Sequence, residues 1–205
     1  MISLAYITSN EEKYIERSIN SAKGIASEIV IVDAFSTDNT RKICKKLGAK
    51  IFKEKWRDDF SYARNVMISK CTQPWILTLD ADEHLEGEDL NLIIQALNYT
   101  TSNEIVAWAL PRKNHYPLHD ADSPFFGPPF YPDLQVRIFQ RRKEIFYSGI
   151  VHEGVQQSID ASKVGFIGRV AVCIHHHMFR GNKEEFESSK GAYYSKLEKG
   201  DSHAR

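Results

Sequence analysis

The first eighty residues alternate between short apolar runs and segments with helical spacing, and this alternation limits the fold more than any other feature. Residues 2–8, 28–33, 49–53 and 75–80 are the expected strands. The second of these contains Ile-Val-Ile-Val, which is apolar on both faces, as in a parallel strand that is covered by helices on each side. Strands that alternate with helices imply right-handed crossovers, so we expect an α/β fold with a mostly parallel sheet flanked by helices.

The segments between these strands have the features of helices. Ser9 and Glu12 match the S-x-x-E pattern of a capping box, which predicts the start of a helix that extends through Ala22. Residues 36–39 offer N-cap side chains to a second helix that ends at Gly48. Residues 60–70 are the third expected helix.

The second half of the chain is less regular. Residues 111–132 hold six of the seven prolines, so we expect an ordered but irregular segment there. Strands are expected at 134–140, 145–151 and 164–176, and a polar helix at 183–199. Because no repeat, low-complexity tract or linker divides the sequence, we expect a single domain over residues 1–205.

Charge and cysteine content argue against several classes of protein. Lysine plus arginine equals aspartate plus glutamate, at 27 each, so no net field points to nucleic acid or to an anionic membrane. Any phosphate recognition must therefore be local. Cys44, Cys71 and Cys173 are far apart, which fits neither a disulfide framework nor a CxxC metal site. With neither a signal peptide nor a membrane span in the sequence, we expect a soluble cytoplasmic protein that binds no nucleic acid.

Asp80-Ala81-Asp82, at the end of the fourth expected strand, is the strongest candidate for a binding site. Carboxylate oxygens suit Mg²⁺ or Mn²⁺, although an acid-x-acid pattern also fits a solvated turn. In parallel sheets, ligands bind beyond the carboxyl ends of the strands, where the strand order reverses. Thr8, Asp33 and the acid pair all follow strand ends, so we expect them to line one crevice.

Six motifs, in this order, resemble the family 2 nucleotide-sugar glycosyltransferases of GT-A fold, particularly the bacterial and archaeal branch that includes lipopolysaccharide-core glucosyltransferases. They are ITSNEE (7–12), IVDAFSTDNT (31–40), FSYARN (60–65), LDADE (79–83), YPDLQVRIF (131–139) and GIVHE (149–153). The resemblance implies a metal-dependent inverting transfer from a nucleotide sugar, in particular a UDP-sugar, to a glycan, lipid-linked or protein acceptor. It divides the domain into a nucleotide-sugar half (1–110) and an acceptor half (111–205).

This resemblance also implies a role in cell-envelope glycan synthesis, with peripheral association at the inner face of the cell membrane as an option. In the nucleotide half, Asp33 is expected to accept the N–H of a uracil. Thr8, Glu11, Ser36 and Asp38 are the expected neighbours of base and ribose. Ser36 and Asp38 fit the role of helix caps equally well.

The diphosphate and metal site is expected around Arg64, Asp80 and Asp82. The planar guanidinium of Arg64 suits a phosphate group because it donates two hydrogen bonds at once. The resemblance implies that Asp80 and Asp82 hold Mg²⁺ or Mn²⁺ against the diphosphate, with Asp82 as the direct ligand. His176 is the preferred third ligand among the histidines at 175–177, and its two neighbours stay open.

Inverting transfer needs a general base for the acceptor hydroxyl. The resemblance implies Glu153 in this role, with Asp133 as the alternative base or as an acceptor contact. His152 and Arg137 are expected to hold the base or the diphosphate. Two other functions stay open: a nucleotidyltransferase of similar topology, which normally carries a glycine-rich basic loop after its first strand, and a non-catalytic module that binds a nucleotide sugar.

Overall fold

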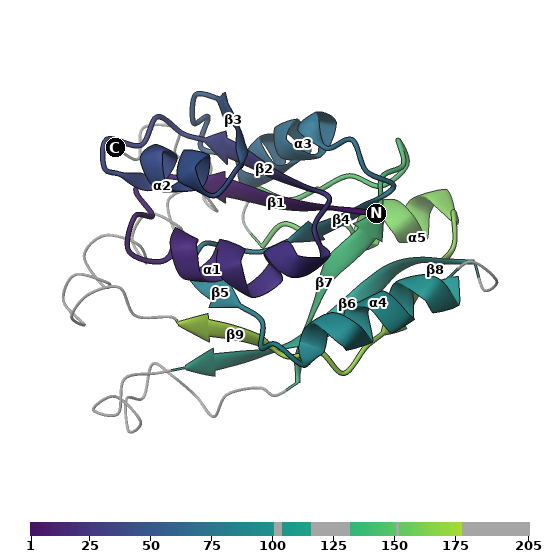
Figure 1. Cartoon of the computed structure of the whole chain (residues 1–205). Helices are drawn as coiled ribbons and strands as arrows, with labels where there is room; N and C mark the ends of the chain where they lie inside the picture. The colour runs from purple at the N-terminus through teal and green to yellow at the C-terminus, as the bar shows by residue number, and fades with distance from the viewer. Residues whose placement is uncertain (101–103, 116–131, 151, 178–205) are drawn as a thin grey trace, which may run out of the picture.

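A single sheet forms the centre of the protein, which a computed structural model describes over residues 1–100, 104–115, 132–150 and 152–177 (Figure 1). Within these residues the strand order is β3-β2-β1-β4-β7-β6-β9-β5, and β8 pairs with β6 off this path. The elements are β1 (Ile2–Thr8), α1 (Ile15–Ala22), η1 (Lys23–Ile25), β2 (Glu28–Asp33), α2 (Thr40–Lys46), β3 (Lys50–Lys53), α3 (Phe60–Lys70), β4 (Trp75–Thr78), β5 (Glu83–His84), α4 (Asp89–Tyr99), β6 (Ile105–His115), β7 (Asp133–Gln140), α5 (Gln156–Ser162), β8 (Phe166–Arg169) and β9 (Ile174–His177).

The strand order reverses at β1. From β1 the chain adds β2 and then β3 on one side, and it later returns to place β4 on the other side, with all these neighbours parallel. Strand β7 then pairs antiparallel with both β4 and β6. The predicted α/β fold with a mostly parallel sheet is therefore confirmed, and the reversal leaves room for a ligand beyond the carboxyl ends of β1 and β4.

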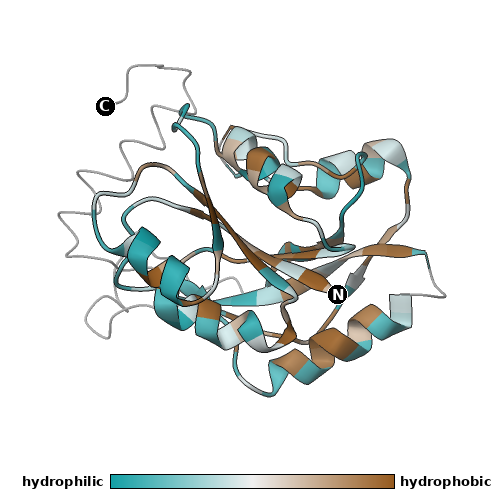
Figure 2. Ribbon diagram, turned by 45° about the horizontal axis from the view of Figure 1, so that its top comes forward, coloured by the Kyte–Doolittle hydropathy of each residue, from teal (hydrophilic) through white to brown (hydrophobic). Residues whose placement is uncertain are grey.

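Helices cover the sheet on both faces, so the protein has three layers. One face packs against α1, α2 and α4, whose buried residues include Ile19, Cys44 and Ile93. The opposite face packs against α3 and α5 through Met67 and Ile159. Hydrophobic residues accordingly follow the strands (Figure 2), and α4 also exposes Leu92 and Ile94 on its outer side. No helix in the described part of the chain is both long enough and apolar enough to cross a membrane.

The predicted capping box at Ser9 and Glu12 is wrong. Helix α1 begins at Ile15, and the carboxylate of Glu12 instead accepts hydrogen bonds from the backbone and side-chain nitrogens of Asn39. Asn10 accepts a further bond from the backbone of Thr37 at 2.8 Å. The residues before α1 therefore connect two loops at the carboxyl edge of the sheet, and they do not cap their own helix.

The second half differs from the prediction at several places. Residues 145–150, the described part of the strand expected at 145–151, form a loop, with a lone bridge between Ser148 and Gly154 and a φ of 99° at Gly149. The expected strand at 164–176 is divided into β8 and β9. Strand β6 extends to His115, into the segment that was expected to be irregular. The remainder of that segment up to residue 131 and the helix expected at 183–199 lie outside the described residues.

Candidate active site

A cavity of about 790 Å³ opens at the carboxyl ends of β1 to β4. Its wall includes Thr8 and Glu11 after β1, Trp56 after β3, and Asp80 with Asp82 after β4. The start of β7 and residues 152–156 close the opposite side. Strand ends that are far apart in the sequence therefore surround one space, as the rule for parallel sheets predicts.

Asp33 does not line this cavity. Its side chain is fully buried and accepts hydrogen bonds from the hydroxyl of Thr8 at 3.1 Å and from the backbone of Ser36 at 3.0 Å. The Ser36 hydroxyl donates to the same carboxylate at 2.5 Å. The next residue, Ala34, is the one that faces the cavity. Asp33 thus lies behind the cavity wall and supports the part of it that Thr8 and Ala34 form.

Asp38 also lies behind the wall. One carboxylate oxygen accepts hydrogen bonds from the backbone and hydroxyl of Thr40, at the start of α2, and the other accepts from the backbone of Glu12 at 3.1 Å. Burial opposes ionisation of Asp38, but these hydrogen bonds lower the pKa of its carboxyl below the ordinary value. Ser36 and Asp38 therefore act structurally at the loop between β2 and α2.

Two buried arginines hold Asp80. The Nη2 of Arg64 donates to Oδ1 of Asp80 at 2.7 Å, and the Nη2 of Arg137 donates to Oδ2 at 3.1 Å. Burial would raise the pKa of Asp80, but the two guanidinium groups hold it well below its usual range. Both carboxylate oxygens thus accept a hydrogen bond from an arginine, so in this structure Asp80 holds the two arginines in place.

Glu83 completes this cluster, although no role was predicted for it. Its fully buried carboxylate accepts from Arg137 at 2.7 Å and from the backbone nitrogen of Asp80 at 2.9 Å, and it lies 3.7 Å from Arg112. Burial raises the pKa of Glu83, and the neighbouring Arg137 opposes the rise. The only sequence signal was a third acid directly after the acid pair. Glu83 holds the turn that presents Asp80.

Asp82 and His176 meet at the cavity because β5 pairs with β9. The backbone nitrogen of His177 donates to the carbonyl of Asp82, and the Nε2 of His176 lies 3.7 Å from Oδ2 of Asp82. The other ring nitrogen, Nδ1, lies 2.8 Å from the amide oxygen of Asn114. An amide oxygen only accepts, so Nδ1 is the donor in this contact and Nε2 is the ring nitrogen that faces the carboxylate of Asp82.

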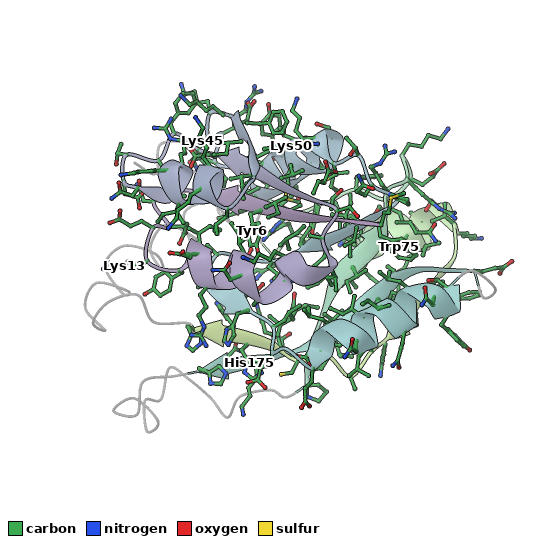
Figure 3. All side chains as sticks on the ribbon, viewed as in Figure 1. Tyr6, Lys13, Lys45, Lys50, Trp75 and His175 are labelled. Atoms are coloured by element: carbon green, nitrogen blue, oxygen red, sulfur yellow. The ribbon has the colours of Figure 1, made fainter. Side chains whose placement is uncertain are left out.

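A divalent cation fits this pair. Mg²⁺ commonly uses one or two protein ligands and takes its remaining oxygens from water and substrate phosphates. In the described residues no group of three or more His, Cys, Asp and Glu side chains is arranged as a closed metal site. His175, marked in Figure 3, and His177 lie on the other side of β9, where their rings lie next to those of His84 and His115.

Glu153 lies on the cavity wall in the loop that Ser148 and Gly154 pinch closed. Its Oε1 accepts a hydrogen bond from the Nε of Arg64 at 2.5 Å, so one guanidinium joins Glu153 to Asp80. His152, also on the wall, has a φ of 57°, an uncommon conformation for a residue with a side chain. The loop thus places the carboxylate of Glu153 on the same side of the cavity as Arg64 and Asp80.

Asp133 is not brought to the cavity wall. Its carboxylate pairs with Arg112 at 2.6 Å and accepts from the amide of Gln135 at 2.7 Å.

Trp56, which carried no predicted role, does line the cavity; its indole N–H donates to Asp58, and its ring packs edge-on against Phe60 at 4.7 Å. Only its place just after a strand end could have identified it from the sequence.

Comparisons with known proteins agree with this geometry. The chain is 29% identical over 189 residues to the SPbeta prophage-derived glycosyltransferase SunS of Bacillus subtilis, covering 91% of the chain and 42% of SunS. It is 31% identical over 199 residues to an uncharacterized glycosyltransferase of Rickettsia typhi, covering 95% of the chain and 65% of that protein. The chain therefore spans less than two thirds of these relatives.

Solved structures share the fold at low sequence identity. TarS 1-349 of S. aureus in complex with UDP-GlcNAc superposes with a TM-score of 0.64 at 19% identity, over 88% of this chain and 59% of that one. Glucosyl-3-phosphoglycerate synthase of Mycobacterium tuberculosis, in complex with Mn²⁺, UDP and glucosyl-3-phosphoglycerate, gives 0.63 at 17% identity, over 96% and 77%. The family model of glycosyl transferase family 2 matches residues 3–156, from β1 to the start of α5, and the chain therefore belongs to that family.

Proposed function

We propose that this glycosyltransferase moves a sugar from a UDP-sugar to an acceptor hydroxyl with inversion at the anomeric carbon, assisted by Mg²⁺ or Mn²⁺. The observation that carries the proposal is the meeting of three groups on one cavity: the Asp82–His176 pair, the arginines around Asp80, and Glu153. Neighbours of the same fold in complex with UDP-GlcNAc, or with UDP and Mn²⁺, support the donor class and the cation.

The arginines are suited to the donor diphosphate. Among the described residues, the Nη1 of Arg64 and the Nε of Arg137 are buried and lack a hydrogen-bond partner. Leaving a buried donor unsatisfied is costly, so a ligand oxygen that accepts from it gains affinity. Asp82 and His176 would hold the cation, which supplies charge neutralisation for the leaving diphosphate.

Glu153 is assigned as the general base. The acceptor oxygen forms a bond to the anomeric carbon while the bond from that carbon to the diphosphate oxygen breaks, and the acceptor proton passes to the carboxylate. Arg64 orients Glu153 by holding Oε1, so we assign the proton transfer to Oε2. A base placed in this way contributes ~100-fold to ~10,000-fold. Asp133 remains the alternative base or an acceptor contact.

The acceptor is proposed to be a glycan, a lipid-linked sugar or a protein, with envelope glycan synthesis and the lipopolysaccharide-core branch as the predicted setting. The acceptor half, residues 111–205, is proposed to contribute its binding surface, and residues 111–115, 132–150 and 152–177 are the described part of it. These finer assignments rest on the motif resemblance and on the position of Glu153 in the second half of the chain.

A screen of nucleotide sugars with Mn²⁺ tests the proposal by thermal stabilisation and by donor hydrolysis. A donor at ~100 times its Kd should stabilise the fold by about 2.7 kcal/mol, or ~5–10 °C for a protein of this size. Asp82→Ala should lose the Mn²⁺-dependent part of the shift, while the exposed control Asp160→Ala keeps it. Glu153→Gln should bind donor but fail in transfer, and Glu86→Gln is its matched control.

The outcomes separate the competing functions. If no nucleotide sugar stabilises the wild type, the glycosyltransferase proposal fails. Donor binding without turnover in the wild type, across the acceptor classes, supports a non-catalytic module. Release of pyrophosphate from a nucleoside triphosphate would favour the nucleotidyltransferase. Normal transfer by Glu153→Gln would move the base to another residue.

A further inference from the structure

One edge of the sheet carries a concentration of positive charge that the proposed function does not use. Residues 41–57, which form most of α2, all of β3 and the segment after it, contain six lysines, two arginines and one acid. The net charge of this stretch is therefore +7, counted as eight cations minus one acid, in a chain whose net charge is zero. We call these eight cationic residues the basic edge: Arg41, Lys42, Lys45, Lys46, Lys50, Lys53, Lys55 and Arg57.

Only three members of the basic edge have an acidic partner among the described residues. Arg41 lies 3.5 Å from Asp33, Lys50 lies 2.8 Å from Glu28, and Arg57 lies 3.3 Å from Glu54. No acid in residues 1–100, 104–115, 132–150 or 152–177 lies within 4.0 Å of the other five, Lys42, Lys45, Lys46, Lys53 and Lys55. All five are exposed. These five ammonium groups are therefore available to interact with an anionic partner.

The basic edge is an outer surface of the molecule. Strand β3 is the last strand on its side of the sheet, and α2 lies next to it. Lys45 and Lys50, which come from these two elements, mark the same upper edge in Figure 3. Lys55 alone among the eight lines the large cavity, so the basic edge begins at the rim of the candidate active site and continues away from it.

Two ordinary explanations account for part of this charge. Lysines on an edge strand prevent pairing with another chain, which explains Lys50 and Lys53. Cations in the last turn of a helix interact favourably with its dipole, which applies to Lys45 and Lys46. Neither effect explains why residues 41–57 contain eight cationic residues and only one acid. A solvated face normally mixes both signs, and five exposed lysines without an acid within 4.0 Å among the described residues exceed that mixture, which indicates an anionic partner.

We propose that the basic edge docks this protein on the surface of an anionic lipid bilayer, independently of which sugar it transfers. Clusters of four to eight lysines and arginines bind such surfaces, and each contributes additively within about one Debye length of the headgroups. Six of the eight cations are lysines, which act as hydrated point charges, whereas nucleic-acid phosphates favour the planar fork of arginine. Docking at this edge would hold the cavity rim near the headgroups.

Vesicle co-sedimentation of the full chain tests the proposal. The wild type should bind vesicles of phosphatidylcholine with about 30% phosphatidylglycerol, and bind pure phosphatidylcholine at least ~10-fold more weakly. Raising NaCl from about 50 mM to about 500 mM should release it. The triple variant Lys42→Glu/Lys45→Glu/Lys46→Glu should bind the anionic vesicles at least ~10-fold more weakly.

The control variant Lys13→Glu/Lys23→Glu/Lys143→Glu makes the same change in net charge at exposed lysines outside the basic edge. It should stay within about twofold of the wild type, since binding depends on charges that reach the surface. Thermal unfolding of both triple variants checks that they fold alike. The proposal is overturned by equal losses in the two variants, by no wild-type binding to anionic vesicles, or by tighter binding to a DNA duplex at the same salt concentration.

Discussion

Replacing Arg137 by Met should destabilise the protein strongly, because it leaves a buried carboxylate without its main partner. Arg137 is 7% exposed at its side chain and Glu83 is 0% exposed, with 2.7 Å between Nη2 and Oε1. Breaking a buried ion pair by removing one member costs about 3–5 kcal/mol. For a domain of this size that is a loss of roughly 6–20 °C in Tm. The exposed control Arg142→Met should change the free energy of unfolding by no more than about 0.5 kcal/mol.

The pH dependence of this loss identifies its cause. Burial already raises the folded-state pKa of Glu83 above its ordinary value of 4.5, and losing Arg137 should raise it further. The variant's folded state then takes up a proton at a higher pH than its unfolded state. Its deficit relative to the wild type should therefore be complete above that raised pKa and shrink as the pH falls toward 4.5.

Urea unfolding of both proteins from about pH 7 to about pH 5 measures this deficit. The double variant Glu83→Gln/Arg137→Met should recover part of the lost stability, because an amide replaces the unpaired charge. A loss below about 1 kcal/mol that does not vary with pH would refute the reasoning, since it would mean that the guanidinium offsets no buried charge.

Three further predictions concern other parts of the fold. Burial, with Arg17 and the neighbouring histidines, lowers the pKa of His84 from 6.5 to about 4, so the unfolded chain binds its proton first and stability should fall as the pH drops from 6.5 toward 4; urea unfolding of His84→Gln should show a flatter acid limb. Burial raises the pKa of Cys44 and Cys71 to about 12, so native mass spectrometry after thiol labelling should find both unmodified until the protein unfolds. A Cβ on Gly168 would lie 2.5 Å from the Trp108 ring, so Gly168→Ala should cost about 1–3 kcal/mol in urea unfolding, while Gly87→Ala, with open space around it, should not.

The elements that depend on local pattern were predictable from the sequence. The strands β1, β2 and β4 follow from their apolar runs, and the rule for ligand position then identified Thr8 and the acid pair as one group. Side-chain direction was harder to predict. Asp33 follows a strand end as expected, but at this position the chain turns Ala34 toward the cavity and Asp33 toward Ser36. A shift of one residue along the chain therefore decides whether a side chain lines the cavity or lies behind its wall.

The contacts between distant elements could not be read from the sequence. Arg64 comes from α3, Arg137 from β7 and Glu83 from β5, and only tertiary packing joins them around Asp80. Strand β5 has two residues, which is too short for any periodicity. The break between β8 and β9 was missed because residues 164–176 keep an apolar pattern through it.

The pairing of β5 with β9 determines when the candidate site becomes complete as the chain is made. Asp82 leaves the ribosome early, whereas His176 follows more than ninety residues later. Chains elongate at about 5–20 residues per second, and contacts between distant residues form late because they close long loops. A nascent chain can therefore gather Arg64, Asp80 and Arg137 while it still lacks the histidine. The proposed cation ligands assemble last, when β9 inserts between β6 and β5.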